Sequence, residues 1–303
     1  MEYNGLVPTR SFVKASQMIK KAVNGNNMCA ITGMPGIGKS TLRQIAIGRY
    51  EENEKYKVIH VQAGIIQTEN EIGSIVSQMI RTLSPEKPRR NGVQQSSQLT
   101  SILQEVSKKH KIILSIDEAQ ELSKKTIYGL KKIHELGSTF QIGSLFSICL
   151  FGKPELGVHL KEYEVGYRIS EHKMNPMDKT EIATLLENNE INFSDKRNND
   201  GFLSLSNGIP LVALTMIKEI KKIAKEKKLE YDTAFSFFTS GDLNQRAKKA
   251  GISNNEISKY IYSKHKKVVD RSTVQKANAG KLNSGLAENI RKATEELINN
   301  KTQ

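Results

Sequence analysis

The sequence has few cysteines, no long apolar run and fewer acidic than basic residues. Its two cysteines, Cys29 and Cys149, lie in apolar, strand-like runs, where a free thiol behaves as a small hydrophobe. Neither has the neighbours of a metal or redox site, which agrees with a cytosolic protein. No run approaches the length of a membrane span, and the first residues lack the apolar region of a secretion signal. We therefore expect a cytoplasmic protein without a membrane partner.

The excess of basic residues is concentrated at one end of the chain. Lys and Arg number 46 against 32 Asp and Glu, for a formal net charge of +14. Residues 240–303 hold 13 basic and 6 acidic side chains, half of that net charge. A merely lysine-rich composition would spread the charge more evenly. The concentrated charge favours a polyanionic partner, either nucleic acid or an acidic membrane surface.

The segment Gly33–Ser40 (GMPGIGKS) matches G-x-x-x-x-G-K-[ST] at every fixed position. It follows a short apolar run and precedes a helix-forming segment, as a phosphate loop requires. Its glycines let backbone N–H groups surround a polyphosphate, and the following helix directs its positive dipole end at the same charge. Lys39 would reach the β- and γ-phosphates of ATP, and the Ser40 hydroxyl would bind Mg²⁺. The predicted nucleotide-binding residues here are Gly33, Pro35, Gly36, Ile37, Gly38, Lys39, Ser40 and Thr41.

An acidic pair, Asp117 and Glu118, follows the apolar run 111–116 in the Walker-B arrangement. Asp117 would bind Mg²⁺, directly or through water. Glu118 would polarise the water that attacks the γ-phosphate. The pair alone would suit any solvated strand end, but after the phosphate loop it indicates an ATPase.

Strands and helices alternate along the first half of the chain, which predicts a doubly wound parallel sheet. We expect strands at 28–32, 57–61, 111–116 and 144–151, and a fifth that starts at Tyr167–Ile169. The expected helices are 41–50, 70–83, 99–110, 123–136, 177–189, 209–228 and 231–238, with a loop over 84–98. The predicted domains are a nucleotide-binding α/β domain (1–174), a helical lid (175–240) and a basic terminal domain (241–303).

The terminal domain has the spacing of a helix-turn-helix. Gly251 lies four residues after the small Ala247, and Ile257 lies ten after it, while Ser253 can cap a second helix over 254–264. That helix would enter the major groove of duplex DNA. The predicted DNA contacts are Asn254, Asn255, Ser258, Lys259, Lys264, Lys266 and Lys267. A small helical bundle that only packs on the lid is the alternative.

The runs Ile116–Gln120 (IDEAQ) and Cys149–Leu156 (CLFGKPEL) extend these motifs. Together they resemble the AAA+ P-loop ATPases that accompany DNA transposases, such as the Mu phage B protein and the ExeA-like target selectors of Tn7-like elements. The loop Pro88–Arg90 is similar to one in the Mu protein, and the resemblance covers about residues 12–225. It implies an ATP-dependent ring or helical filament that coats DNA and recruits or stimulates a transposase in DNA transposition and recombination. In such an oligomer Arg89 and Arg90 would contribute to DNA contact.

The resemblance also implies roles for three further positions. Arg168 falls where these proteins carry an arginine that reaches the ATP of a neighbouring subunit, and would be a catalytic residue with Lys39 and Glu118. Lys153 occupies the sensor position after Gly152, where relatives often have Asn or Gln, and would contact phosphate. Leu211 replaces the second-sensor arginine of the lid, which implies slow hydrolysis that DNA or a partner stimulates.

Two other functions fit the same motifs. The run Gly208–Leu211 (GIPL), together with the phosphate loop, also resembles the STAND class of nucleotide-controlled switches in regulation or defence. A helicase loader would share the ATPase core and bind a replicative helicase in place of a transposase.

Overall fold

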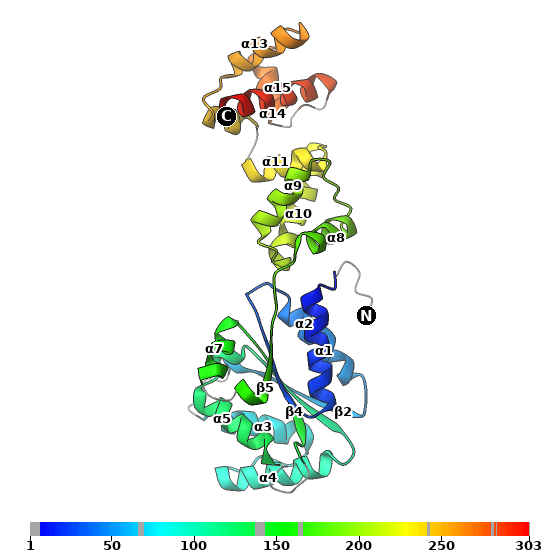
Figure 1. The fold of residues 1–303 in the computed structure, drawn as a ribbon, viewed down its shortest axis with the longest axis vertical. Helices are drawn as coiled ribbons and strands as arrows, with labels where there is room; N and C mark the ends of the chain where they lie inside the picture. Colours follow the sequence, from blue (N-terminus) through cyan, green and yellow to red (C-terminus); the bar gives the residue numbers. More distant parts are fainter. Residues whose placement is uncertain are drawn as a thin grey trace. The chain divides into compact units, whose positions relative to one another are not determined.

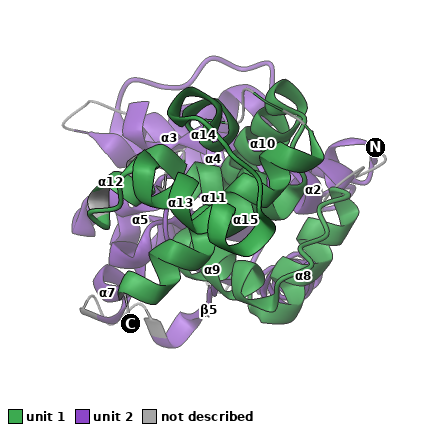
Figure 2. Cartoon of the chain, turned by 90° about the horizontal axis from the view of Figure 1, so that it is seen from above, with its two compact units in different colours: residues 1–7, 177–303 green, residues 8–176 purple. Residues whose placement is uncertain are grey.

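The computed structural model describes residues 7–65, 70–136, 143–162, 166–240, 243–279, 282 and 284–302. The chain divides into two compact units, which Figure 2 colours separately. We call residues 8–176 the α/β unit and residues 1–7 and 177–303 the helical unit.

The α/β unit contains a sheet with helices on both sides (Figure 1). The sheet is parallel, with the strand order β2-β3-β4-β1-β5. The strands are β1 (Met28–Thr32), β2 (Tyr56–Gln62), β3 (Lys111–Asp117), β4 (Phe146–Gly152) and β5 (Ile169–Lys173). Strands β1 and β4 are buried along their whole length, because helices cover both faces of the sheet. All carboxyl ends meet at one edge, which is where nucleotides bind in doubly wound folds.

Alternate residues of β1 point into two different hydrophobic clusters. Cys29 and Ile31 pack with α1 and α2, whereas Met28 and Ala30 pack with α3, α4, α5 and α7. The helices are α1 (Arg10–Asn24), α2 (Lys39–Glu51), α3 (Glu71–Leu83), α4 (Gly92–Val106), α5 (Lys124–His134) and α7 (Pro154–Glu162). The predicted doubly wound α/β fold is therefore confirmed.

The two cysteines are neighbours in the sheet. Cys29 on β1 is paired in register with Cys149 on β4, and both are free and buried. The hydrogen bond with Cys29 and burial together raise the pKa of the Cys149 thiol well above its ordinary value. Both cysteines therefore behave as the small core hydrophobes that the apolar sequence around them predicts.

Three expectations about this unit are wrong in detail. The predicted loop over 84–98 ends early, because the Asn91 side chain accepts hydrogen bonds from the amides of Val93 and Gln94 and so caps α4. The predicted helix over 99–110 therefore starts at Gly92 and ends at Val106. The fifth strand starts at Ile169, and Arg168 lies before it in the 3₁₀ turn η3 (Gly166–Arg168).

The helical unit contains two hydrophobic clusters. One is formed by α8 (Lys179–Asn188), α9 (Lys196–Ser206), α10 (Pro210–Lys227) and α11 (Tyr231–Ser240). The other is formed by α12 (Leu243–Lys249), α13 (Asn254–His265), α14 (Arg271–Asn278) and α15 (Gly285–Thr302). Helix α9 is a correction to the sequence prediction, and the separation into a lid and a terminal domain at residue 240 stays a prediction. Across the described residues, no helix is both long and apolar enough to cross a membrane.

Candidate nucleotide-binding site

The loop Gly33–Ser40 joins β1 to α2 and depends on its glycines. Gly36 has a φ of +76° and Gly38, the residue that precedes α2, a φ of +100°, which L side chains rarely adopt. A Cβ added to Gly33 would lie 2.9 Å from Cγ2 of Ile37. The Gly33 amide donates to the Gly152 carbonyl at the end of β4, 3.3 Å away. The loop thus has the tight backbone of a phosphate loop at the amino end of a helix.

Lys39 lies against the same loop. Its Nζ donates to the carbonyls of Gly33 and Met34, at 2.8 and 3.1 Å. Burial lowers the pKa of the Lys39 ammonium from its ordinary value, and the charges of Glu118 and Asp117 oppose that shift. The structure therefore brings the loop lysine and the acidic pair into one electrostatic environment.

Asp117 ends β3, and both of its carboxylate oxygens have partners. Oδ1 accepts a hydrogen bond from the Glu118 amide, 3.0 Å, and Oδ2 lies 3.3 Å from Nε of Arg43 on α2. Ser40, in the first turn of α2, is exposed. A hydroxyl and a carboxylate are the oxygen ligands that Mg²⁺ takes together with nucleotide phosphates and water. Among the described residues no group of three or more His, Cys, Asp or Glu could hold a metal without such phosphates.

Glu118 occupies an unusual backbone conformation for a residue other than glycine, with a φ of +52°. Its Oε2 accepts a hydrogen bond of 2.6 Å from Nε2 of Gln120 and lies 3.9 Å from Nζ of Lys153. The Lys153 amide donates to Oε1 of Gln120, 2.9 Å. The structure therefore brings the predicted base and the predicted sensor lysine together, through a glutamine. The left-handed backbone of Glu118 is a form of local strain that is often found at functional sites.

The other predicted loop residues differ in exposure. Pro35 is exposed, Gly36 and Thr41 are half-buried, and Ile37 is buried in the cluster formed with α1 and α2. The Ile37 side chain therefore anchors the loop to the hydrophobic cluster, and only the Ile37 backbone could contact a phosphate.

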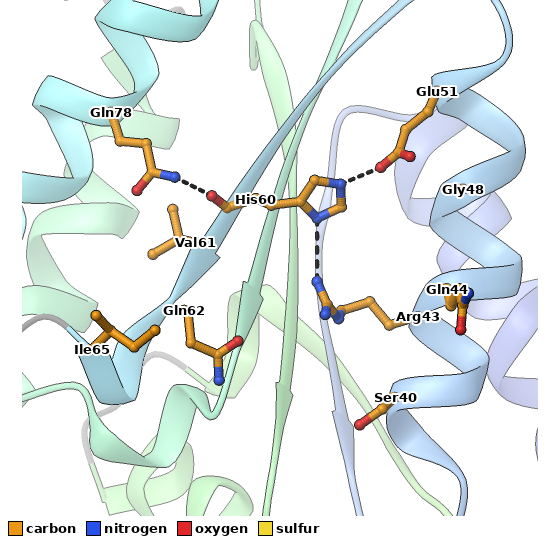
Figure 3. A pocket seen from close by; sticks show the side chains of 10 residues that line it. All are labelled: Ser40, Arg43, Gln44, Gly48, Glu51, His60, Val61, Gln62, Ile65 and Gln78. Atoms are coloured by element: carbon orange, nitrogen blue, oxygen red, sulfur yellow. Dashed lines mark hydrogen bonds and ion pairs between the residues drawn. The ribbon is translucent and has the colours of Figure 1, made fainter.

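A groove of about 710 Å³ opens between α2, β2 and α3, beside Ser40 (Figure 3). Within it Arg43 points toward His60, with Nη1 donating to Nδ1 at 3.3 Å, and Nε2 of His60 contacts Glu51. Since Arg43 also contacts Asp117, the groove and the acidic pair share one side chain. The lining residues are Ser40, Arg43, Gln44, Gly48, Glu51, His60, Val61, Gln62, Ile65 and Gln78.

Arg168 is not brought to the phosphate loop of its own chain. It precedes Ile169, which is paired with Met28 at the start of β1, whereas the loop follows Thr32 at the other end of that strand. Strands rise about 3.3 Å per residue, so Arg168 and Gly33 lie roughly 20 Å apart along the strand direction. The Arg168 side chain is 67% exposed and forms an ion pair of 3.2 Å with Glu135.

Arg89 and Arg90 lie in an exposed segment between α3 and α4. The Arg89 amide donates to Oε1 of Gln98 on α4, 3.0 Å, and the Gln98 amide donates to Glu86, 2.8 Å. The backbone of the segment is thus tied to α4 while both arginine side chains face solvent.

Helices α12 and α13 are joined at Gly251, whose φ is +68°. Ala247 and Ile257 are buried in the cluster of α12–α15, at 1% and 0% exposure. The Ser253 hydroxyl and the Glu256 side chain cap the start of α13 reciprocally. The helices and the turn occur where the spacing predicts them, and DNA binding by α13 stays a prediction.

The predicted DNA contacts on and after α13 are not equally available. Lys259, Lys266 and Lys267 are exposed, whereas Lys264 donates to both oxygens of Glu296, at 2.8 and 2.6 Å. The remaining three are polar: Asn254 is half-buried, Asn255 is exposed and accepts from Nε of Arg271, and the Ser258 hydroxyl donates to the Asn254 carbonyl. Lys264 is thus partly neutralised within the chain.

Sequence reasoning missed Arg43 and Gln120. Arg43 lies three residues after Ser40 on a helix, a spacing that places both on one face, so it could have been suspected. Gln120 belongs to the IDEAQ run, but its bridge to β4 joins residues that are 33 apart in the chain. No local pattern shows that contact.

The chain is similar to several known proteins. A family model described as an AAA domain matches residues 22–157. Cdc6p from Pyrobaculum aerophilum is similar in structure, with a TM-score of 0.51 and 12% identity over 96% of this chain and 81% of that one. The RuvB Holliday junction branch migration motor of Thermotoga maritima has a TM-score of 0.47 and 16% identity, over 84% and 76%. A Walker-type ATPase of Pyrococcus abyssi has a TM-score of 0.49 and 15% identity, over 78% of this chain and 71% of that one.

A search of curated proteins found no match. The likeness to Cdc6p supports the fold alone, and the family match covers the segment that carries the phosphate loop and the acidic pair. Residues 22–157 therefore match an AAA domain, and the α/β unit has the AAA+ P-loop ATPase fold.

Proposed function

We propose that the protein is an ATP-dependent DNA-binding ATPase that oligomerises on duplex DNA and selects target DNA for a transposase, or stimulates it. One observation carries most weight. Lys39 bonds to the glycine loop that follows β1, and Asp117 and Glu118 follow the end of β3, so residues from distant parts of the sequence meet at the carboxyl edge of the sheet. This arrangement suits a nucleoside triphosphate with its terminal phosphate toward the acidic pair.

In this site the phosphate-loop amides bind the polyphosphate. Lys39 exchanges its two loop carbonyls for the β- and γ-phosphates. Ser40 and Asp117 hold Mg²⁺, which when bound neutralises charge on those phosphates. Glu118 orients the attacking water and accepts its proton. Lys153, 3.9 Å from Glu118, is placed to contact the γ-phosphate.

Arg168 supports an oligomer. A guanidinium near the γ-phosphate stabilises the charge of the transition state. Because Arg168 lies at the opposite edge of the sheet from its own phosphate loop, it serves that purpose only at the site of a second copy. Its exposed position beside Tyr167, which is 97% exposed, leaves it accessible to such a neighbour.

DNA binding is supported by charge and by α13. The segment 240–303 carries half of the net charge, and Lys259, Lys266 and Lys267 face solvent from or just after a well-capped helix. Asn255 and Arg271 offer amide and guanidinium groups of the kind that read base edges. The exposed Arg89 and Arg90 provide a further basic segment.

The transposase partner rests on the sequence motifs, and the cytoplasmic location rests on the two free cysteines and the lack of a secretion signal. The IDEAQ and CLFGKPEL runs carry the resemblance to ATPases that accompany transposases. Leu211, 61% exposed at the start of α10, has no charge to offer a phosphate. We therefore expect slow basal hydrolysis that DNA or the partner accelerates.

The experiment is electron microscopy of the full chain with ATP and duplex DNA, supported by sedimentation. Rings or helical filaments along DNA are expected with ATP and the parent protein, and loss of them with Lys39→Ala. Particles that stay monomeric with ATP and DNA would overturn the proposal. Assembly with ATP but without any dependence on DNA would favour a nucleotide switch that binds proteins.

A further inference from the structure

Gln120 connects the predicted base to another strand by two hydrogen bonds, and its Nε2 also donates to Oε1 of Glu121 at 3.1 Å. It lies in the short 3₁₀ turn η2 (Ala119–Glu121), directly after the acidic pair. Its Nε2 donates to Oε2 of Glu118 at 2.6 Å, and its Oε1 accepts from the Lys153 amide at 2.9 Å. One side chain therefore joins the end of β3 to the end of β4.

The end of β4 is shaped to receive this side chain. Gly152 is buried, and a Cβ added to it would lie 2.8 Å from Oε1 of Gln120. Any larger residue at position 152 would displace the amide from Lys153. The glycine thus leaves the space that the bridge requires.

The same strand end contacts the phosphate loop. The carbonyl of Gly152 accepts a hydrogen bond of 3.3 Å from the amide of Gly33, the first loop glycine. Contacts therefore run without a gap from Gly33 through Gly152 and Lys153 to Gln120, and from Gln120 to Glu118. A small movement of the phosphate loop could therefore shift the Glu118 carboxylate through these hydrogen bonds.

Glu118 needs such a support. Its backbone is held in the left-handed region. Its side chain is 40% exposed, so without a hydrogen-bond partner the carboxylate would be free to rotate in solvent. An amide that binds Oε2 fixes the carboxylate plane and leaves Oε1 available for a water. Glutamine suits the position because it donates to a carboxylate and accepts from an amide at the same time.

We propose that Gln120 is a positioning residue that holds Glu118 for attack on the γ-phosphate and transmits the state of the phosphate loop to it through the end of β4. This rests on the proposed role of Glu118 as the base. The side chain of Gln120 bonds to Glu118, to Glu121 and to the Lys153 amide, so its loss should slow turnover without weakening nucleotide binding.

The informative variant is Gln120→Glu, which keeps the size of the side chain and the acceptor for the Lys153 amide. It replaces the donor to Glu118 with a second carboxylate oxygen. At alkaline pH the two carboxylates repel each other, whereas at acid pH they share a proton and the hydrogen bond is restored. We expect kcat to fall by about 10- to 100-fold at pH 8 and to recover partly toward pH 6, with nucleotide Kd within about twofold of the parent.

Gln120→Ala should lose a similar fraction of kcat without the recovery at acid pH. Gln94→Glu, at an exposed glutamine of α4, is the matched control and should follow the parent at every pH. Turnover is measured with the full chain at saturating ATP and Mg²⁺, and Kd with a fluorescent ATP analogue.

The outcomes separate the two proposals. Parent-like turnover and pH profile in both Gln120 variants, with Glu118→Gln inactive, would overturn the positioning role and leave the base intact. Loss of nucleotide affinity together with turnover would also overturn it, because Gln120 would then support the loop itself. Parent-like turnover in Glu118→Gln would instead overturn the assignment of the base.

Discussion

Arg43 and Asp117 form an ion pair between α2 and β3, with Nε 3.3 Å from Oδ2 and side chains only 26% and 13% exposed. The guanidinium therefore binds the carboxylate that is predicted to hold Mg²⁺. The guanidinium takes one lone pair of Oδ2 and draws charge from the carboxylate, so Arg43 weakens the attraction of Asp117 for a metal.

Arg43→Gln should lower the Mg²⁺ concentration that half-saturates ATP turnover, by about three- to tenfold, because Asp117 loses the guanidinium that draws charge from it. The measurement is a Mg²⁺ titration at saturating ATP. Arg49→Gln, on the exposed side of the same helix, is the control and should leave the midpoint unchanged. A higher Mg²⁺ requirement in Arg43→Gln would show that the guanidinium helps to bind the nucleotide.

Lys39→Ala and Glu118→Gln should separate binding from hydrolysis. Loss of Lys39 removes the cation nearest the terminal phosphates, so ATP binding should be abolished. Glu118→Gln keeps the shape of the base and should bind ATP normally while hydrolysis falls by roughly 100-fold or more, which traps the DNA-bound oligomer. Equilibrium binding and steady-state turnover check both, and a Lys39→Ala protein with parent affinity would refute the role of the loop lysine.

Arg168→Ala should bind ATP as the parent does but lose DNA-stimulated hydrolysis. Mixing it with Lys39→Ala should restore part of the activity, because at one interface each mutant supplies what the other lacks. Glu135→Gln removes the ion-pair partner of Arg168 and should not lower activity. If the two mutants assemble together and the mixture stays inactive, Arg168 does not act in trans.

Lys266→Gln with Lys267→Gln should flatten the salt dependence of DNA binding by up to about two units of log–log slope, since each neutralised phosphate contributes about 0.9. Lys264→Gln should change the slope much less, because Lys264 is already paired with Glu296. Asn255→Ala should alter sequence preference and leave the slope unchanged. Equal slopes in all variants would place the DNA contacts elsewhere on the chain.

The α/β unit should lose stability as the pH falls from about 7.5 to 5.5. His134 is buried and donates to the Asn26 carbonyl at 2.9 Å, and burial lowers its pKa. The unfolded chain then binds the proton at a higher pH than the folded one, so stability is complete above the ordinary pKa of about 6.5 and is lost below it. His134→Gln should reduce this dependence in urea unfolding. Identical pH slopes would exclude His134 as a cause.

Local patterns predicted much of the α/β unit and of the site. The glycine loop, Lys39 and the acidic pair are read from adjacent residues, and apolar runs bounded by polar ones indicate β1, β3 and β4. The sequence pattern predicts a start of α4 at residue 99, seven residues after its actual start at Gly92. That start is set by one capping residue, Asn91, within a polar segment. The contacts of Arg43 and Gln120 depend on how β3 and β4 lie beside each other, which no sequence spacing shows.

Arg168 and the phosphate loop lie at opposite ends of the strands, so a subunit that acts in trans gives its arginine from one end of the sheet and binds ATP at the other. In a head-to-tail assembly each subunit gives Arg168 to one neighbour and receives an arginine from the other. A closed ring then completes every site, whereas an open line always has one terminal subunit whose ATP lacks an arginine. Turnover per subunit should therefore rise with the length of an open assembly, and that terminal subunit gives the line a chemical polarity.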